Sequence, residues 1–213
     1  MNLPPGTYLA FEGAIGAGKT ALARIVAEET GAQLILDEAD DNPYLRDFYR
    51  DPRRYALQLQ LNFLLTRHRQ QMEIKQINIF QQAVVTDYLY ERDRIFAHLN
   101  LEERELELYD RVALLLSGEV PKPDLVVYLQ SSPERLMTNI RVRDRDYEST
   151  ITPEYLKELC ELYHQFFFHW DATPLLILNS TRLDFVNNSE HRRSLLDAIA
   201  RLPAGTTYFN PEA

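Results

Sequence analysis

The sequence has almost no cysteine and fewer basic than acidic residues. Cys160 is the only cysteine in 213 residues, so the chain cannot form an internal disulfide; a reducing cytoplasm suits it, and a packed thiol is expected. Lysine and arginine number 23 against 32 aspartate and glutamate residues, a formal net charge of −9. Because nucleic-acid binding needs clustered basic residues, we expect a small-molecule substrate and no nucleic-acid partner.

Long apolar runs are also missing. No segment approaches the roughly 18 apolar residues that a membrane span requires, and residues 1–7 lack the pattern of a secretory signal. We therefore expect a cytoplasmic protein without membrane contact. No internal repeat or linker is visible, and the length suits a single α/β domain over residues 1–213.

A complete phosphate-loop motif, G-x-x-x-x-G-K-[ST], follows an apolar run at residues 8–11 and precedes a helical pattern at 21–29. Its positions are Gly13, Ala14, Ile15, Gly16, Ala17, Gly18, Lys19 and Thr20. Backbone N–H groups would bind phosphates, Lys19 would reach the β- and γ-phosphates, and Thr20 would ligate Mg²⁺. The alternative is a glycine-rich turn that binds nothing. Since both flanks are correct, the motif predicts a nucleotide-handling protein.

The remaining pattern alternates strands with helices. Five buried strands are expected, at residues 8–11, 33–36, 83–87, 125–129 and 175–178. Helices are expected at residues 21–29, 53–77, 92–99, 102–116, from 133 onward, 153–170 and 190–201. This order predicts a doubly wound, five-stranded parallel sheet covered on both faces. In the helix at 153–170, the core is expected to hold Phe166, Phe167, Phe168 and Trp170.

Acidic residues follow two of these strands. Asp37 and Glu38 come after the second strand, and Asp87 ends the third. Ligands of α/β folds bind at the carboxyl edge of the sheet, so these carboxylates are catalytic or Mg²⁺-binding candidates. A solvated loop is the alternative for Asp37 and Glu38.

Two further patterns have a functional and a bland interpretation. Gln60 and Arg67 are seven residues apart, so they share a helix face to within about 20°, either as a binding pair or as a wetted edge. Arg141, Arg143 and Arg145 alternate along a charged run. Such runs are often solvated surface, but in a phosphate-transfer protein they favour a mobile lid that clamps the phosphoryl group.

Several short segments stand in a fixed order along the chain: FEGAIGAGKT at 11–20, NPYL at 42–45, FY at 48–49, YALQLQ at 55–60 with Arg67, IFA at 95–97 and PKPD at 121–124. Together these segments resemble the deoxynucleoside kinase family, especially bacterial deoxyadenosine and deoxyguanosine kinases. The resemblance extends over about residues 8–201, and the ordered combination is more specific than any single motif.

The resemblance implies ATP-dependent phosphorylation of the 5′-hydroxyl of a deoxyribonucleoside, with purines favoured, in nucleotide salvage by a homodimer. It also implies the roles of several residues. Gln60 would bind the base beside Arg67, Phe96 would stack on it, and Tyr49 and Glu148 would bind the 3′-hydroxyl. Arg143 and Arg145 would be lid arginines, Asp184 and Phe185 would belong to the loop at the ATP adenine, and Asp87 would lie beside the metal.

The chain departs from its look-alikes in three places. Tyr88 follows Asp87 where many members have arginine, so a cation near the transferring phosphate is missing from that position. Asn139 replaces a frequent first lid arginine, for which Arg141 is the candidate substitute. The usual catalytic glutamate aligns with Asp37, and we expect Asp37 to be the general base, with Glu38 as the alternative.

Two other functions compete with this interpretation. A nucleoside monophosphate kinase, such as a thymidylate kinase, shares the phosphate loop and the lid but needs basic residues for the acceptor phosphate. A GTP-driven switch or other non-catalytic regulator needs a D-x-x-G element and an N/T-K-x-D motif. Neither motif occurs in the sequence.

Overall fold

The computed structural model describes residues 1–80, 82–181 and 183–210. Its centre is a parallel sheet with the strand order β2-β3-β1-β4-β5-β6. The strands are β1 (Tyr8–Glu12), β2 (Gln33–Ile35), β3 (Val84–Thr86), β4 (Leu125–Gln130), β5 (Leu175–Asn179) and β6 (Thr206–Phe209). Every pairing between neighbouring strands is parallel.

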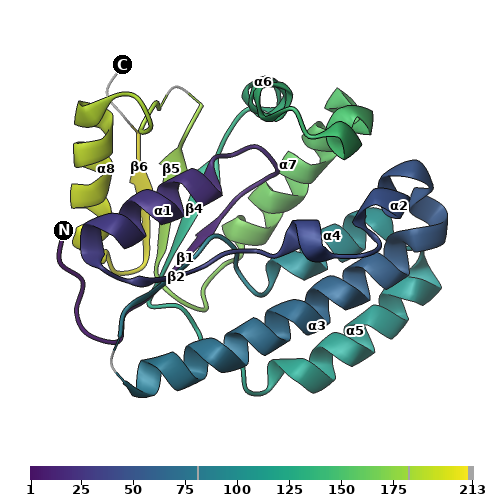
Figure 1. Ribbon diagram of the computed structural model, residues 1–213, viewed down its shortest axis with the longest axis horizontal. Helices are drawn as coiled ribbons and strands as arrows, with labels where there is room; N and C mark the ends of the chain where they lie inside the picture. Colours follow the sequence, from purple (N-terminus) through teal and green to yellow (C-terminus); the bar gives the residue numbers. More distant parts are fainter. Residues whose placement is uncertain (81, 182, 211–213) are drawn as a thin grey trace.

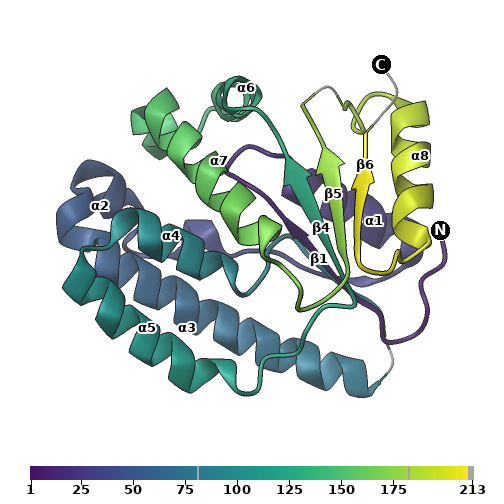
Figure 2. The same ribbon diagram turned by 180° about the vertical axis from the view of Figure 1, so that it is seen from behind.

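Helices cover both faces of the sheet, as the alternating pattern predicts. The helices are α1 (Lys19–Thr30), α2 (Leu45–Arg50), α3 (Pro52–Ile79), α4 (Arg92–Asn100), α5 (Glu103–Ser117), α6 (Pro133–Arg143), α7 (Pro153–Phe168) and α8 (Ser189–Ala200), with 3₁₀ helices η1 (Ala39–Asp41) and η2 (Asp146–Thr150). Figures 1 and 2 show α1 on one face and α7 on the other, with α3 and α5 side by side.

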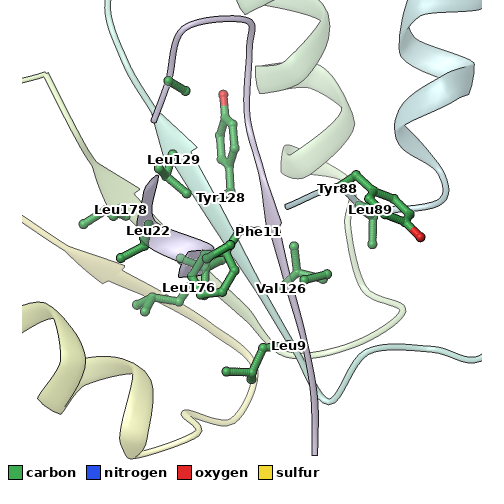
Figure 3. Packing of buried hydrophobic residues seen from close by; sticks show 14 of the residues in the cluster. Leu9, Phe11, Leu22, Tyr88, Leu89, Val126, Tyr128, Leu129, Leu176 and Leu178 are labelled. Carbon is green, nitrogen blue, oxygen red and sulfur yellow. The ribbon is translucent and has the colours of Figure 1, made fainter. Parts of the chain in front are cut away.

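The central strands β1, β3 and β4 form because they are short, mostly apolar runs that are buried along nearly their whole length. All five residues of β1 are buried, as are the first five of β4, which is typical of a parallel sheet covered on two sides. Leu9 and Phe11 of β1, Val126 of β4 and Leu22 of α1 belong to this core (Figure 3). The core therefore fixes β1, and with it the start of the glycine-rich loop.

The expectation of five strands is wrong, because the described residues contain a sixth. β6 pairs with β5 at the sheet edge, and its residues alternate between exposed and half-buried. An edge strand has a neighbour on only one side, so it needs no continuous apolar run. The Thr-Thr-Tyr-Phe composition after Gly205 was the available signal.

Buried polar groups tie the core to the sheet edge. Glu12 ends β1 and is fully buried, and its carboxylate accepts hydrogen bonds from the Gly13 N–H, the Leu89 N–H and the Tyr163 hydroxyl. Glu12 thus joins the glycine-rich loop to the segment after β3.

Cys160 is a buried free thiol, as expected, and burial raises its pKa to about 11.

Helix α6 begins with a side-chain cap. The Ser132 hydroxyl accepts a hydrogen bond from the Arg135 N–H at the start of α6, where Pro133 occupies the first turn.

Among the helices in the described parts of the chain, none is long and apolar enough to cross a membrane.

Candidate active site

Three neighbouring strands end at one edge of the sheet and deliver the candidate catalytic groups. The glycine-rich loop follows β1, Asp87 directly follows β3, and Asp37 lies two residues beyond β2. The strand order β2-β3-β1 places these ends side by side. The Asp37 N–H donates a 2.7 Å hydrogen bond to Oδ1 of Asp87, which fixes two of the ends to each other.

The glycine-rich loop curls around its own lysine. Lys19 begins α1, and its ammonium group donates to the carbonyl oxygens of Gly13 at 2.7 Å and Ala14 at 3.1 Å. Burial and then the charge of Arg92 lower the Lys19 pKa, nearby carboxylates oppose them, and the resulting pKa is about 8. Gly16 has a φ of 84°, a left-handed conformation that side chains disfavour.

Thr20 and Asp87 meet at the start of α1. The Thr20 hydroxyl donates a 2.5 Å hydrogen bond to Oδ2 of Asp87. These two oxygens are hard ligands of the kind that Mg²⁺ prefers. Within the described ranges, no group of three or more His, Cys, Asp or Glu side chains could hold a metal. Thr20 and Asp87 therefore fit a magnesium ion that takes its remaining ligands from phosphates and water.

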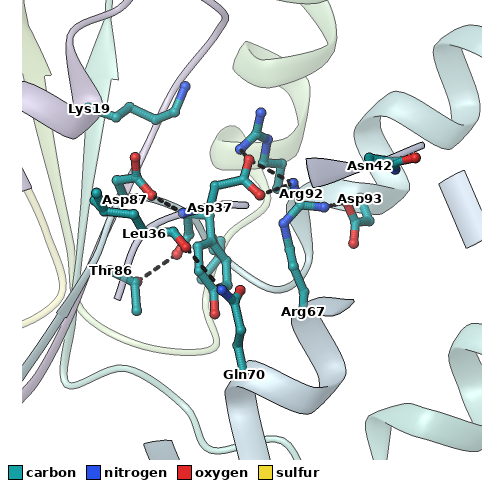
Figure 4. A network of polar contacts seen from close by, with 12 residues as sticks. Lys19, Leu36, Asp37, Asn42, Arg67, Gln70, Thr86, Asp87, Arg92 and Asp93 are labelled. Carbon is teal, nitrogen blue, oxygen red and sulfur yellow. Dashed lines mark hydrogen bonds and ion pairs between the residues drawn. The ribbon is translucent and has the colours of Figure 1, made fainter. Parts of the chain in front are cut away.

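A buried ion-pair network surrounds Asp37 (Figure 4). Nη2 of Arg67 donates to both Asp37 carboxylate oxygens at 2.9 Å, and Nη1 of Arg67 donates to Asp93. Nη1 of Arg92 donates to Oδ2 of Asp37 at 2.8 Å. Burial alone would raise the Asp37 pKa, but the charges of Arg67 and Arg92 outweigh it and lower that pKa. Asp37 is therefore an ionised carboxylate at neutral pH.

One cavity adjoins this network, which we call the acceptor cavity. From the sequence-predicted site, its lining includes Ile15, Gly16, Lys19, Thr20, Asp37, Tyr49, Gln60, Arg67, Asp87, Phe96, Arg143, Arg145 and Glu148. The buried Oε1 of Gln60 has no hydrogen-bond partner among the described residues. Leaving a buried polar atom without a hydrogen-bond partner costs free energy, so the cavity wall at Gln60 suits a ligand with hydrogen-bond donors.

The charged run at the end of α6 borders the same cavity. Arg143 and Arg145 both lie near Glu148, with Arg143 forming an ion pair to it. Arg145 also pairs with Asp40 at 2.9 Å, and the Tyr147 hydroxyl donates to Asp40. The run thus contacts η1 across the cavity instead of projecting into solvent as an isolated charged surface.

A second cavity also borders the glycine-rich loop, and we call it the donor cavity. Its lining includes Gly16, Ala17, Gly18, Lys19, Thr20, Arg143, Arg145, Asp184 and Phe185. Asn139, the residue found where an arginine was expected, donates a 2.8 Å hydrogen bond to the Gly16 carbonyl. Asn139 therefore fastens the loop to α6. Because the two cavities share Lys19 and Thr20, groups bound in them would meet at these residues.

Some predicted site residues do not reach either cavity. Glu38 lies outside both and pairs with Arg69 at 3.0 Å on the surface. Tyr88 is fully buried in the core, and Arg141 is exposed and lines only a separate hollow. Gly13 and Ala14 are not in the lining, although their carbonyl oxygens hold Lys19.

Sequence reasoning missed several residues that line these cavities. Charged or aromatic examples are Arg92, Asp93 and Tyr147 in the acceptor cavity and Arg135 in the donor cavity. Arg92 and Asp93 stand between the Asp87 and IFA motifs, and their proximity to these motifs was the available signal. Charged residues at a helix start usually face solvent, so the pattern alone did not distinguish them.

A sequence profile described as "Deoxynucleoside kinase" matches residues 9–202. A deoxyadenosine kinase of Dictyostelium discoideum is 38% identical over 167 residues, which cover 76% of this chain and 66% of that protein. A deoxyguanosine kinase of Bacillus subtilis (strain 168) is 35% identical over 164 residues, covering 76% of this chain and 78% of that protein.

Solved structures share the fold. A deoxyadenosine kinase from M. mycoides, with the products dCMP and a flexible dCDP bound, has a TM-score of 0.80 at 21% identity and covers 92% of this chain and 100% of its own. The structure of that kinase with bound dATP has a TM-score of 0.79 at 20% identity and covers 91% and 98%. Because these identities are only 21% and 20%, the likeness shows a shared α/β kinase fold alone.

Proposed function

The chain belongs to the deoxynucleoside kinase family, and from that premise we propose that it transfers the γ-phosphoryl group of ATP to the 5′-hydroxyl of a deoxyribonucleoside. The product would be the 5′-monophosphate, as in nucleotide salvage. We propose purines as the favoured bases, because relatives include a deoxyadenosine kinase and a deoxyguanosine kinase. Residues 1–213 would form one kinase domain in the cytoplasm, where ATP is available.

The observation that carries this proposal is the junction of the two cavities. Lys19 and Thr20 line both cavities, while Asp37 lines the acceptor cavity alone. A donor phosphate held by the loop would therefore end beside a carboxylate that can receive a proton. This is the arrangement that phosphoryl transfer to an alcohol needs, since positioning and charge neutralisation supply most of its catalysis.

The donor side of the chain fits ATP and Mg²⁺. Lys19 now donates to carbonyl oxygens of its own loop, and the same ammonium group would bind phosphate oxygens instead. Thr20 and Asp87 would hold the magnesium ion, and Phe185 with Asp184 would border the adenine. When bound, ATP supplies the phosphoryl group and Mg²⁺ neutralises part of its negative charge.

The acceptor side would bind the nucleoside through a polar and an aromatic wall. The buried Gln60 amide would hydrogen-bond the base edge, with Arg67 beside it, and Phe96 would stack on the base. Tyr49 and Glu148 would bind the 3′-hydroxyl. Support comes from the unpartnered Oε1 of Gln60 and from the presence of all five side chains in one lining.

Asp37 would act as the general base, in preference to Glu38. Its carboxylate would orient the 5′-hydroxyl and accept the proton late, because phosphoryl transfer passes through a loose transition state. A lowered pKa is compatible with this role, since an ionised carboxylate is available over the neutral range. Lys19, Arg143 and Arg145 would stabilise the charge that shifts toward the leaving group.

Residues 141–148 would form the lid. Arg145 and Tyr147 contact Asp40 across the acceptor cavity, so the segment already bridges the two sides of the site. In the lid, Arg143 and Arg145 would exchange carboxylate partners for phosphate oxygens. The role expected for Arg141 finds no support in the lining of either cavity.

We further propose a homodimer. Leu108 and Leu115 of α5 are 46% and 84% exposed and stand two turns apart on one helix face. The neighbouring α3 exposes Leu65 to 54%. Apolar side chains gathered on adjacent helices are typical of an interface between subunits. Light scattering should give a dimer mass for the wild type and a monomer mass for Leu115→Glu; a monomeric wild type would contradict this assembly.

The deciding experiment is a phosphorylation assay with ATP and Mg²⁺ across the four deoxynucleosides, their ribonucleoside counterparts and their monophosphates. We expect the highest kcat/KM for deoxyadenosine or deoxyguanosine and little activity on monophosphates. Phosphorylation of monophosphates alone would identify a nucleoside monophosphate kinase. Absence of turnover with every acceptor would reject a kinase function.

A further inference from the structure

Arg92 is a buried cation at the junction of the two cavities. It is the first residue of α4, its side chain is 12% exposed, and it lines the acceptor cavity with Lys19, Thr20 and Asp87. Figure 4 shows the ends of the Lys19 and Arg92 side chains on the same side of the Asp37 carboxylate. A long basic side chain that starts a helix would ordinarily extend into water, so this placement needs an explanation.

The hydrogen bonds of Arg92 leave donors unused. Arg92 makes one side-chain hydrogen bond in the described parts of the chain, from Nη1 to Asp37, and its buried Nε has no partner there. In contrast, both terminal nitrogens of Arg67 are engaged by carboxylates. One face of the Arg92 guanidinium lies 5.1 Å from the Phe96 ring centroid. The buried Nε of Arg67 also lacks a partner, so the difference is at Nη2, which is engaged in Arg67 and makes no hydrogen bond in Arg92 within the described residues. Arg92 therefore has more capacity than Arg67 for another anion.

The charges around Arg92 also favour an added anion. Lys19 is buried nearby, and after burial itself the charge of Arg92 is the largest influence that lowers the Lys19 pKa. Two neighbouring buried cations repel each other, and an anion between them would relieve that repulsion. Burial disfavours the charged form of Arg92, but Asp37 and further acidic neighbours, among them Glu12 and Asp93, together outweigh burial and raise the pKa of Arg92.

We propose that Arg92 is a catalytic residue that binds the oxygens of the phosphoryl group during its transfer. The proposal rests on the proposed kinase function. Position 88 holds an uncharged tyrosine that is fully buried in the core, so no cation reaches the phosphate from there. Arg92, at the start of α4, would supply that cation instead. Its bond to Asp37 would at the same time keep the carboxylate beside the acceptor hydroxyl.

In the proposed phosphoryl transfer, the bond that forms is matched by the bond that breaks, and the proton and the leaving group both have a destination. A bond forms between the 5′-oxygen and the γ-phosphorus while the bond from that phosphorus to the β–γ bridging oxygen breaks. ADP leaves with the electron pair of the broken bond, and the hydroxyl proton passes to Asp37. Arg92 donates hydrogen bonds to the equatorial oxygens of the group in transit and stays bound to the phosphate of the product.

Arg92→Met tests this role, with Arg94→Met as the matched control. Arg94 is on the same helix two residues later, but it is exposed and pairs with Asp110. We expect Arg92→Met to lower kcat by about a hundredfold or more, and the control to stay within about twofold of the wild type. In calorimetric titrations, Arg92→Met should weaken deoxyadenosine monophosphate binding about tenfold more than deoxyadenosine binding, because only the product carries a phosphate.

The second measurement separates contact from positioning. If Arg92 merely holds Asp37, Arg92→Met would weaken nucleoside and monophosphate binding equally, and the proposed phosphate contact would be wrong. Arg92→Lys keeps the charge with fewer donors, and we expect a kcat loss of about tenfold even if Arg92→Met does not fold. Near-normal kcat in either folded variant would overturn the proposal. A wild type inactive on all deoxynucleosides would instead reject the underlying kinase function.

Discussion

Asp37 and Glu38 are consecutive residues, yet Asp37 lies in the acceptor cavity and Glu38 lies outside it. The Asp37 side chain is 11% exposed and bound by Arg67 and Arg92, whereas the Glu38 side chain is 41% exposed and pairs with Arg69. The Glu38 side chain is one methylene longer than that of Asp37, but its carboxylate lies outside the cavity, so the extra length gives no advantage. The shorter side chain is therefore the better candidate for the base.

Asp37→Asn should lower kcat by about a hundredfold to ten-thousandfold, which is the usual contribution of general-base catalysis. Asparagine retains the size of aspartate but cannot accept the proton. Glu38→Gln should leave kcat within about twofold of the wild type. Steady-state assays with saturating ATP and deoxyadenosine, on variants whose circular dichroism matches the wild type, provide the comparison. A large loss confined to Glu38→Gln would assign the base to Glu38.

Much of the fold could be predicted because the buried strands carry continuous apolar runs. The errors came where burial depends on neighbours distant in sequence. Phe168 was expected in the core but is 85% exposed, since three consecutive helical residues cannot all face one direction. β6 was missed because an edge strand needs fewer apolar residues than a central one.

The site divides in the same way between local and distant information. The loop at Thr20 and the strand-end Asp87 were predicted from local patterns, and their side chains meet at 2.5 Å. Arg92 was missed because its burial depends on Asp37, which lies 55 residues away in the sequence. Only the folded sheet brings the end of β2 beside the start of α4. The spacing of the residues contains no such information.

Thr20→Val should raise the Mg²⁺ concentration needed for half-maximal activity by about tenfold, because valine has the shape of threonine without its oxygen ligand. Thr20→Ser keeps the hydroxyl and should remain within about threefold of the wild type. Magnesium titrations at fixed free ATP compare the two variants. Equal magnesium dependence in both would show that Thr20 does not bind the ion and serves only as the hydrogen-bond donor to Asp87.

Gly16→Ala should destabilise the protein more than Gly31→Ala does. Both glycines have positive φ values, 84° and 68°, which cost a side-chain-bearing residue about 1–2 kcal/mol. An added Cβ at Gly16 would lie 2.9 Å from the Leu136 carbonyl oxygen, whereas at Gly31 nothing lies within 4 Å. Urea unfolding should show Gly16→Ala to be less stable by roughly a further 1–3 kcal/mol. Equal losses would mean that the loop moves freely away from α6.

The activity should fall with rising pH as Lys19 loses its proton. Its pKa in the free protein is about 8, so half of the ammonium charge is lost at that pH and most of it a unit higher. We expect kcat/KM for ATP to decrease above about pH 8. Bound phosphates favour the charged form, so kcat at saturating ATP should decline only at higher pH.

Unfolding would not explain this decline. The folded pKa of Lys19 lies below the ordinary value of 10.5, so above pH 8 the folded state holds fewer protons at this site than the unfolded chain. The contribution of Lys19 to stability therefore rises with pH while activity falls. Lys19→Met should lower kcat by about a hundredfold and remove the decline in kcat/KM near pH 8. Rate measurements from pH 6.5 to 9 with deoxyadenosine as acceptor test both effects, and a decline that persists in Lys19→Met would assign the titration to another group.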